Sequence, residues 1–277
     1  MSQTWHSAEA PEPVTVTPAG WLRVLLRGGP LALLLLVCFP LLLLVRLIEA
    51  PVFGQRRPVT PYITCFVCRS AFALMGMGFS SRGAPMAGAG GVVANHSSWL
   101  DIFALNARHR IVFVSKAEVA GWPGIGWLAR GTGTLFIERN RHKAREQQQM
   151  FEDQLRAGQR LVFFPEGTST DGMRVLPFKT TLFQAFFAPS LNRDMQIQPV
   201  TVIYRAPRGA SPRFYGWWGD MGFGTHLLKV LSAPRQGAVE LVYHPPVQVA
   251  AFASRKALAA HLEQTVRGGL PFINGSE

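Results

Sequence analysis

From Gly90 onward, short runs of apolar and β-branched residues alternate with stretches of helical spacing, and no other feature of the sequence constrains the fold as strongly. Such alternation is typical of a mainly parallel sheet with helices packed on its faces. We therefore predict an α/β sandwich. The expected strands are 91–95, 111–115, 133–137, 160–164, 197–204 and 239–243, and the expected helices are about 98–108, 141–157, 179–188, 222–231 and 254–267.

Two apolar stretches precede this region. The first, 31–45, is uncharged, lies near the lower length limit for crossing a bilayer of about 30 Å, and is interrupted by Pro40. The second, 62–79, carries Arg69 at its middle, which is unfavourable at the centre of a bilayer but acceptable at its interface. We expect residues 21–80 to form a helical hairpin embedded in one leaflet of a membrane. A single true span and a hairpin buried in a soluble core are the alternatives.

The remaining chain divides around this hairpin. Residues 1–20 are polar and rich in Pro and Thr, and we expect them to form a disordered tail. The α/β domain is expected over 85–277. Its length leaves room for one large domain with a substantial core.

The composition favours a membrane-associated chain with an anionic partner. Hydrophobic residues make up 48% of the 277 residues and charged ones 16%, and the net charge of +12 comes almost entirely from arginine. Such a basic surface suits anionic lipid head groups, phosphates, an acidic carrier protein or nucleic acid. No nucleic-acid-binding module is visible, so we expect no nucleic-acid partner. No motif has metal-ligand spacing, so we expect no metal, and Cys38, Cys65 and Cys68 fit a reducing compartment or burial in lipid.

The stretch 91–101 carries a histidine directly after an expected strand and an aspartate five residues later. A neutral imidazole is well suited to remove a proton near pH 7, and a carboxylate on its other nitrogen fixes the tautomer. His96 is the expected base and Asp101 its orienting acid. They can meet only if His96 lies in the loop and Asp101 in the first helical turn, with Ser98 as N-cap. The alternative is that Asp101 merely caps the helix.

Further polar residues follow the other expected strands. Because ligands bind beyond the carboxyl ends of strands in open α/β sheets, these groups are expected to converge on one cleft. They are Asn95 and His96 after the first run, Lys116 and Glu118 after the second, Glu138 and Arg139 after the third, and Pro165, Glu166, Gly167 and Thr168 after the fourth.

The Pro-Glu-Gly-Thr turn has a chemical interpretation and a structural one. The carboxylate of Glu166 could bind a hydroxyl or amine of the substrate, while backbone N–H groups near Gly167 and Thr168 could face a developing oxyanion. The alternative is that Glu166 caps the turn. Arg139 begins a basic cluster at the start of a helix, which favours an anionic partner, although a solvated basic face is the alternative for part of it.

Four blocks in order make the chain resemble the lysophospholipid acyltransferase superfamily, which includes 1-acylglycerol-3-phosphate acyltransferases. They are 95–101 with the H-x4-D motif, 133–139, 164–168 and 197–200. The resemblance implies a membrane-bound O-acyltransferase without a covalent enzyme intermediate. His96, held by Asp101, would deprotonate an acceptor hydroxyl that attacks an acyl thioester of coenzyme A or acyl carrier protein, with no bound cofactor.

The resemblance also implies where the acceptor binds and where the enzyme works. Arg139 and the Glu166 block would bind a lysolipid, with Asn95 and Lys116 lining the same cleft. The expected location is the bacterial inner membrane, with the active site facing the cytoplasm.

One departure bears on the acceptor. Many members that act on phosphate-bearing acceptors read F-P-E-G-T-R, whereas Ser169 occupies the position of that arginine here. The string 164–179, with 217–221 downstream, is similar to lyso-ornithine lipid acyltransferases. We therefore expect lyso-ornithine lipid as the main acceptor, and lysophosphatidic acid is a second candidate because Arg174 or Lys179 could still reach a phosphate. A dedicated 1-acyl-sn-glycerol-3-phosphate acyltransferase is the alternative.

Two other classes compete with this interpretation. A serine lipase using Ser97 or Ser98 is disfavoured because the sequence has no G-x-S-x-G elbow. A noncatalytic protein that binds a membrane surface would not need His96. The tryptophan pair, Trp217 and Trp218, fits either an acyl or head-group site or packing against the membrane.

Overall fold

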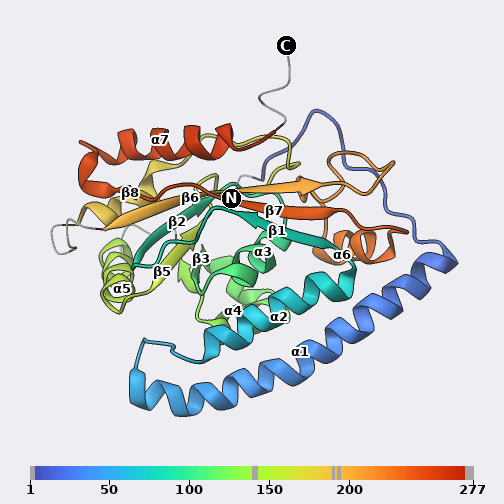
Figure 1. Cartoon of the computed structure of the whole chain (residues 1–277), viewed down its shortest axis with the longest axis horizontal. Helices are drawn as coiled ribbons and strands as arrows, with labels where there is room; N and C mark the ends of the chain where they lie inside the picture. Colours follow the sequence, from blue (N-terminus) through green and yellow to red (C-terminus); the bar gives the residue numbers. More distant parts are fainter. Residues whose placement is uncertain (1–3, 139–142, 189–190, 192–194, 272–277) are drawn as a thin grey trace.

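The computed structural model describes residues 4–138, 143–188, 191 and 195–271, and its centre is one eight-stranded sheet with helices on both faces (Figure 1). The strands are β1 (Gly78–Arg82), β2 (Gly90–Ala94), β3 (Val112–Lys116), β4 (Leu135–Ile137), β5 (Arg160–Phe163), β6 (Gln196–Arg205), β7 (Ala238–Tyr243) and β8 (Val247–Gln248).

The sheet has the order β1-β7-β6-β2-β5-β3-β4, with β8 also paired to β6. All neighbours are parallel except β6 with β7 and β6 with β8. The prediction of a mainly parallel sheet is therefore confirmed. β2 lies at its centre and is buried along its whole length, which fits its continuous apolar run.

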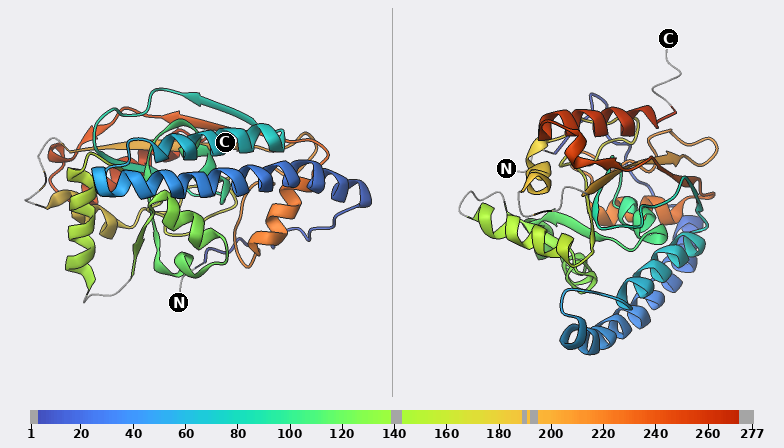
Figure 2. Two further views of the ribbon diagram at one scale, coloured as in Figure 1. Left: turned by 90° about the horizontal axis from the view of Figure 1, so that it is seen from below. Right: turned by 60° about the vertical axis from the view of Figure 1, so that its left-hand side comes forward.

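The helices form a layer on each face of the sheet (Figure 2). One buried cluster includes side chains of α2 and α3 and the facing side of β6, whereas the other includes side chains of α5, α7 and the opposite side of β6. The helices are α1 (Pro18–Phe53), α2 (Thr60–Met75), α3 (Leu100–Arg108), α4 (Ile125–Thr132), α5 (Ala144–Arg156), α6 (Phe223–Ser232) and α7 (Arg255–Gly268).

The expected elements and the observed ones differ in a few places. The segment expected as a helix at 179–188 is a 3-10 helix over Thr180–Phe187. The first residues of the helix expected at 141–157 lie outside the described residues. The sequence analysis missed α4, which at eight residues is too short for a clear helical period.

The apolar N-terminal region forms the predicted helical hairpin, but its first helix is longer and its second helix is shorter than expected. α1 runs for 36 residues, roughly 54 Å, and stays helical through Pro30 and Pro40. It is the one helix among the described residues that is long and apolar enough to cross a membrane by length and composition. α2 ends at Met75 because Gly76 adopts a left-handed conformation with φ 73°. Residues 78–80, expected in the hairpin, instead belong to β1, which pairs with β7.

A buried carboxylate closes the hairpin. Glu49 near the end of α1 accepts hydrogen bonds from the N–H of Val59 at 2.6 Å and from the N–H and Oγ1 of Thr60 at 3.1 and 2.7 Å. The residue at the N-cap of α2, Val59, has no side chain that can cap, so Glu49 supplies the acceptor from the other helix. The turn is thus fixed by a contact between the two arms.

The N-terminal half of α1 is tied to α6. Arg27 donates to the carbonyl oxygens of Leu231 and Ala233 at 2.8 and 2.6 Å, and Arg23 donates to that of Ser232 at 3.2 Å. These carbonyls end α6, where unpaired acceptors and the negative end of the helix dipole favour cations. These two arginines therefore fasten α1 to the α/β domain.

The segment expected as a disordered tail makes specific contacts over its described part. Residues 4–17 form no helix or strand, and α1 already begins at Pro18 with Thr17 as its N-cap. The N–H of Trp5 donates to Thr168 Oγ1 at 3.3 Å, and its carbonyl accepts from the N–H of Gly219 at 3.0 Å. Glu9 pairs with Arg213. Composition alone does not reveal such contacts because their partners are distant in the sequence.

Candidate active site

The site begins where β2 leaves the sheet. The side chain of Asn95 pairs with the backbone of Val202 in β6, accepting from its N–H at 2.7 Å and donating to its carbonyl at 2.9 Å. Asn95 is fully buried. This amide, expected to contact substrate, therefore extends the contact of β2 with β6 by one residue and fixes the point at which the chain turns into the loop.

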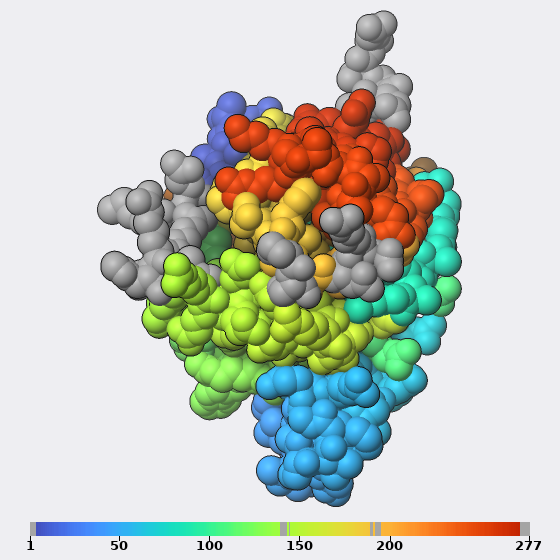
Figure 3. All heavy atoms as spheres, turned by 90° about the vertical axis from the view of Figure 1, so that its left-hand side faces the viewer, coloured from blue at the N-terminus to red at the C-terminus, as the bar shows by residue number. Residues whose placement is uncertain are grey.

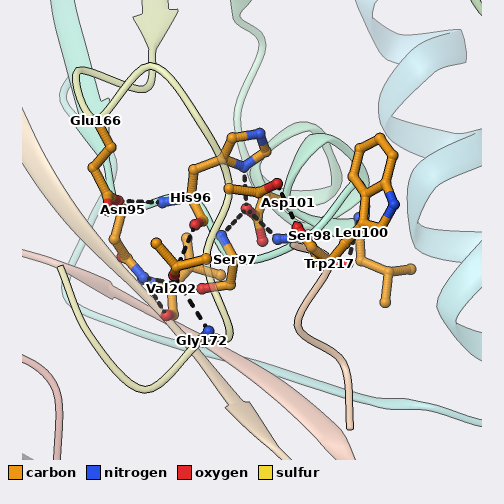
Figure 4. Close-up of polar contacts among 12 residues, drawn as sticks. Asn95, His96, Ser97, Ser98, Leu100, Asp101, Glu166, Gly172, Val202 and Trp217 are labelled. Carbon is orange, nitrogen blue, oxygen red and sulfur yellow. Dashed lines mark hydrogen bonds and ion pairs between the residues drawn. The ribbon is translucent and has the colours of Figure 1, made fainter. Parts of the chain in front are cut away.

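His96 and Asp101 meet as the spacing predicts (Figure 4). His96 Nδ1 lies 2.7 Å from Asp101 Oδ2, with His96 in the loop and Asp101 in the first turn of α3. The same oxygen accepts the N–H groups of Ser97 and Ser98 at 2.8 and 3.0 Å. Asp101 thus contacts the imidazole and binds two N–H groups of the loop, but these groups precede the N-cap residue of α3, which has no side-chain cap bond. Ser98 itself is not the N-cap, since that position belongs to Trp99.

The second carboxylate oxygen of Asp101 binds a tyrosine that the sequence analysis did not single out. Tyr204 Oη donates to Asp101 Oδ1 at 2.6 Å, and both side chains are buried. Burial and the neighbouring carboxylate raise the pKa of Tyr204 well above its usual value, so it stays a neutral donor. Asp101 is thereby held at both oxygens.

The imidazole is also fixed by stacking. The rings of His96 and Phe164 lie 4.0 Å apart between centroids and 8° from parallel. The side chain of His96 is 18% exposed. Because Nδ1 faces Asp101, the other ring nitrogen, Nε2, is left for a substrate proton. The ring is therefore held in one orientation with one nitrogen available.

Glu166 lies beneath this pair and is 1% exposed. Its Oε1 accepts the N–H of His96 at 2.7 Å, and its Oε2 accepts the N–H of Leu176 at 2.7 Å. Burial raises its pKa to about 8, although the two N–H donors act in the opposite direction. The carboxyl group that was expected to bind substrate thus bonds to two backbone N–H groups and links the loop that carries His96 to the segment around Leu176.

Two segments form the wall beside His96. The N–H of Thr170 donates to the carbonyl oxygen of His96 at 2.9 Å, and the N–H of Trp217 donates to that of Ser97 at 2.8 Å. Ser169 Oγ donates to the carbonyl oxygen of Trp217 at 2.5 Å and so joins the two segments. The indole of Trp217 packs edge-on against Trp122 at 6.1 Å. The backbone of Trp217 therefore contacts the loop that carries His96, whereas its indole ring packs against Trp122.

The Gly167-Thr168 turn already makes contacts within the protein that the sequence does not reveal. The N–H of Gly167 donates to the carbonyl oxygen of Phe164 at 3.0 Å, and Thr168 Oγ1 accepts from Trp5. Gly167 has φ 73°, and a Cβ there would lie 2.7 Å from Lys179 Nζ. The ammonium group of Lys179 therefore rests directly on this turn.

Two of the expected site residues remain. Lys116 ends β3, which is separated from β2 by β5. Arg139 lies outside the described residues.

Tyr204 was not singled out from the sequence, Phe164 was noted only as part of the block 164–168, and Trp217 was expected either at an acyl or head-group site or in packing. Tyr204 had a detectable signal. It shares one face of its strand with Val200 and Val202, so a phenol stands where the pattern calls for an aliphatic side chain. A buried hydroxyl requires a partner, and that requirement would have pointed to a polar group on the neighbouring helix.

Comparisons with known proteins indicate the family of the chain. Residues 84–203 match the protein-family model described as Acyltransferase. The chain is 58% identical over 266 residues to a lyso-ornithine lipid O-acyltransferase of Rhodobacter capsulatus, covering 96% of each chain. It is 31% identical over 180 residues to a 1-acyl-sn-glycerol-3-phosphate acyltransferase of Neisseria gonorrhoeae, covering 64% of this chain and 67% of that protein.

A solved structure shows the same fold. The crystal structure of the 1-acyl-sn-glycerophosphate acyltransferase PlsC from Thermotoga maritima matches 91% of this chain and 99% of its own, with a TM-score of 0.56 at 21% identity.

The sheet, the imidazole–carboxylate pair and these matches define an enzyme that transfers acyl groups. The chain belongs to the acyltransferase family, and the superfamily resemblance stated from its motifs is confirmed. The relative that it matches over nearly its whole length is a lyso-ornithine lipid O-acyltransferase.

Proposed function

We propose that this acyltransferase moves a fatty acyl group from a thioester to the free hydroxyl of lyso-ornithine lipid, and that it also accepts lysophosphatidic acid. The observation that carries the proposal is the bond of 2.7 Å between His96 Nδ1 and Asp101 Oδ2, which leaves Nε2 for the acceptor. A dedicated 1-acyl-sn-glycerol-3-phosphate acyltransferase is the competing function.

In the proposed reaction, Nε2 of His96 removes the proton of the acceptor hydroxyl as its oxygen attacks the thioester carbon. The carbon–sulfur bond then breaks, and the imidazolium returns the proton to the departing thiolate. Asp101 stabilises the imidazolium between these steps. A positioned base of this kind contributes about 10²–10⁴ in rate. Glu166 acts as a positioning residue because it holds the N–H of His96.

Ser97 and Ser98 do not suit a lipase mechanism. They are 1% and 0% exposed, and their backbone N–H groups both bind Asp101. A serine nucleophile must reach the carbonyl carbon of its substrate. We therefore favour direct transfer without an acyl-enzyme.

The acceptor assignment is supported by Ser169. Its hydroxyl bonds to the backbone of Trp217, so this position offers no cation for a phosphate. The ammonium group of Lys179 lies beside the neighbouring Gly167, where it is a candidate cation for an anionic acceptor. The name of the relative from Rhodobacter capsulatus supports the same choice.

The membrane assignment is supported by the hairpin. α1 exposes many large apolar side chains, among them Leu36, Leu47 and Ile48 at 72%, 70% and 74%. Such a surface is favoured in contact with lipid. We propose that the hairpin lies in the inner membrane, that the site faces the cytoplasm, and that residues 85–277 form the acyltransferase domain.

The direct test uses the purified full chain in lipid discs. Lyso-ornithine lipid and lysophosphatidic acid are offered separately, each with labelled acyl carrier protein thioester and with labelled acyl coenzyme A. We expect transfer to both acceptors, faster to lyso-ornithine lipid, and no burst of acyl-enzyme. Transfer to lysophosphatidic acid alone would support the competing function.

A further inference from the structure

A hollow with a volume of about 340 Å³ lies at the end of the sheet opposite His96. It is formed where the hairpin turn meets two turns of the α/β domain, and Figure 3 shows the hairpin tip, in blue, directly below α5, in yellow-green. Gly90 pairs with Arg160 at the amino ends of β2 and β5, whereas His96 follows the carboxyl end of β2. The hollow is therefore separate from the active site by the length of a strand.

Four arginines line this hollow, and we call them the arginine pocket: Arg56, Arg57, Arg110 and Arg160. The other lining residues are apolar or neutral, so the lining holds no carboxylate. Among the described residues, none of the four takes part in an ion pair. Positive charge thus gathers in the lining, and the nearby carboxylate of Glu49 acts on Arg57 from outside it.

The side-chain hydrogen bonds of the arginine pocket go to neutral oxygens only. Arg57 donates to the carbonyl of Gly131 at 2.8 Å, Arg110 to Tyr62 Oη at 2.9 Å, and Arg160 to the carbonyl of Gly88 at 3.0 Å. These bonds hold the guanidinium groups in place without neutralising them. Placed guanidinium groups are suited to bind phosphate oxygens, often two at a time.

Arg110 and Arg160 also repel each other. Burial, and then the charge of Arg110, lower the pKa of Arg160. Burial, and then the charge of Arg46 outside the pocket, lower the pKa of Arg57, although Glu49 acts in the opposite direction. The charged forms of both are therefore disfavoured in the protein alone. An anion in the hollow would remove this repulsion.

We infer that the arginine pocket binds the phosphate-bearing head group of an anionic phospholipid. The hollow is about as large as the smaller ligand sites of proteins. Phe53 lines it, and α1 continues from there with the exposed side chains of Ile48 and Val52. A lipid could therefore place its phosphate on the arginines and its acyl chains along the helix.

An acidic carrier protein fits this place less well. A stable protein partner needs roughly 800 Å² on each side, spread over a surface. The four arginines instead converge on one hollow beside an apolar helix. The site goes beyond the proposed function, because it lies away from the reacting groups and would set how the enzyme is seated on anionic lipid.

The test compares binding to phosphatidylcholine vesicles with and without phosphatidylglycerol. The variant is Arg56→Gln/Arg110→Gln, chosen because both side chains are exposed. The control, Arg208→Gln/Lys256→Gln, removes the same charge from exposed positions outside the hollow. Acyl transfer in detergent, where no vesicle is present, reports whether each variant is folded.

We expect the pocket variant to lose about 25-fold in partition to phosphatidylglycerol vesicles, about fivefold for each arginine, with partition to pure phosphatidylcholine unchanged. The control should change by less than about twofold, and all proteins should keep their activity in detergent. Equal losses in both variants would overturn the inference, since general charge would then explain the binding.

Two further arms separate the other sources of an anion. Displacement of the wild-type chain from vesicles by millimolar inorganic phosphate would assign the hollow to a soluble phosphate and overturn the lipid assignment. Loss of binding to acyl carrier protein in the pocket variant, with vesicle partition intact, would overturn it in favour of an acidic protein.

Discussion

Tyr204 at the end of β6 and Asp101 in the first turn of α3 share a buried hydrogen bond of 2.6 Å, although 103 positions separate them in the sequence. The bond connects the sheet to the acid that orients His96. Through it, a residue that touches no substrate fixes the charge distribution of the catalytic pair. The imidazole, the carboxylate and the phenol thus act as one unit.

Replacing Tyr204 by Phe removes this donor and leaves Asp101 Oδ1 buried without it. We expect a loss of about 1–3 kcal/mol in the free energy of unfolding and roughly tenfold in kcat. Tyr215→Phe is the matched control, because its hydroxyl is also hydrogen-bonded, to Gln236 Oε1 at 2.8 Å, but lies outside the catalytic unit. It should destabilise the fold similarly and leave kcat unchanged. Equal effects on kcat would show that Tyr204 is only structural.

The His96→Ala variant should lose about 10²–10⁴ in transfer rate, and Asp101→Asn should lose a similar factor while keeping the fold. An amide oxygen at position 101 can still accept the N–H groups of Ser97 and Ser98, but the negative charge opposite the imidazolium is gone. His261→Ala on the exposed side of α7 is the control. Turnover of labelled thioester and thermal unfolding are measured together. Near-normal turnover in either site variant contradicts the assignment.

Glu166 makes the stability of the fold depend on pH. Its folded pKa of about 8 lies above its ordinary value of 4.5, so between these values the folded state binds more protons than the unfolded state. The contribution of this group to the free energy of unfolding is complete below pH 4.5 and is lost as the pH rises through 8. The amide of Glu166→Gln does not titrate. The Tm of this variant should therefore lie furthest below that of wild type at low pH, and the difference should become smaller as the pH rises to 8. Parallel curves for the two proteins would rule this out.

Ser169→Arg tests the choice of acceptor. The change adds a cation where phosphate-binding relatives of the F-P-E-G-T-R type carry one, and it removes the bond to the carbonyl oxygen of Trp217. We expect kcat/KM to shift by about tenfold towards lysophosphatidic acid and away from lyso-ornithine lipid, the equivalent of one charge-assisted hydrogen bond. Ser169→Ala loses the same bond without adding charge and should not change the ratio. A ratio that moves equally in both variants would exclude electrostatic selection at this position.

The sequence predicts the local part of the site and misses the long-range part. His96 and Asp101 are five positions apart, so strand, loop and helix signals suffice to place them together. The contact with Tyr204 depends on β6 lying beside β2, which no local pattern encodes. β1 was missed because Gly78–Arg82 contains two serines and a glycine and lacks an apolar run.

The role of Glu166 shows a second limit. Its position after an apolar strand correctly predicts that it belongs to the site. Whether such a carboxylate faces substrate or the backbone depends on which N–H groups the fold brings to it, and here those of His96 and Leu176 arrive from separate segments. The sequence indicates that a carboxylate belongs to this site, but it does not indicate which groups the carboxylate faces.

The hydrogen bonds from Arg23 and Arg27 to the last carbonyl oxygens of α6 couple the movement of α1 to that of α6. α6 follows directly after the Trp217–Met221 loop, whose backbone touches Ser97. A tilt of α1 must either carry α6 along or break three hydrogen bonds at once. The position of His96 is therefore coupled to that of α1 through α6 and the loop that precedes it.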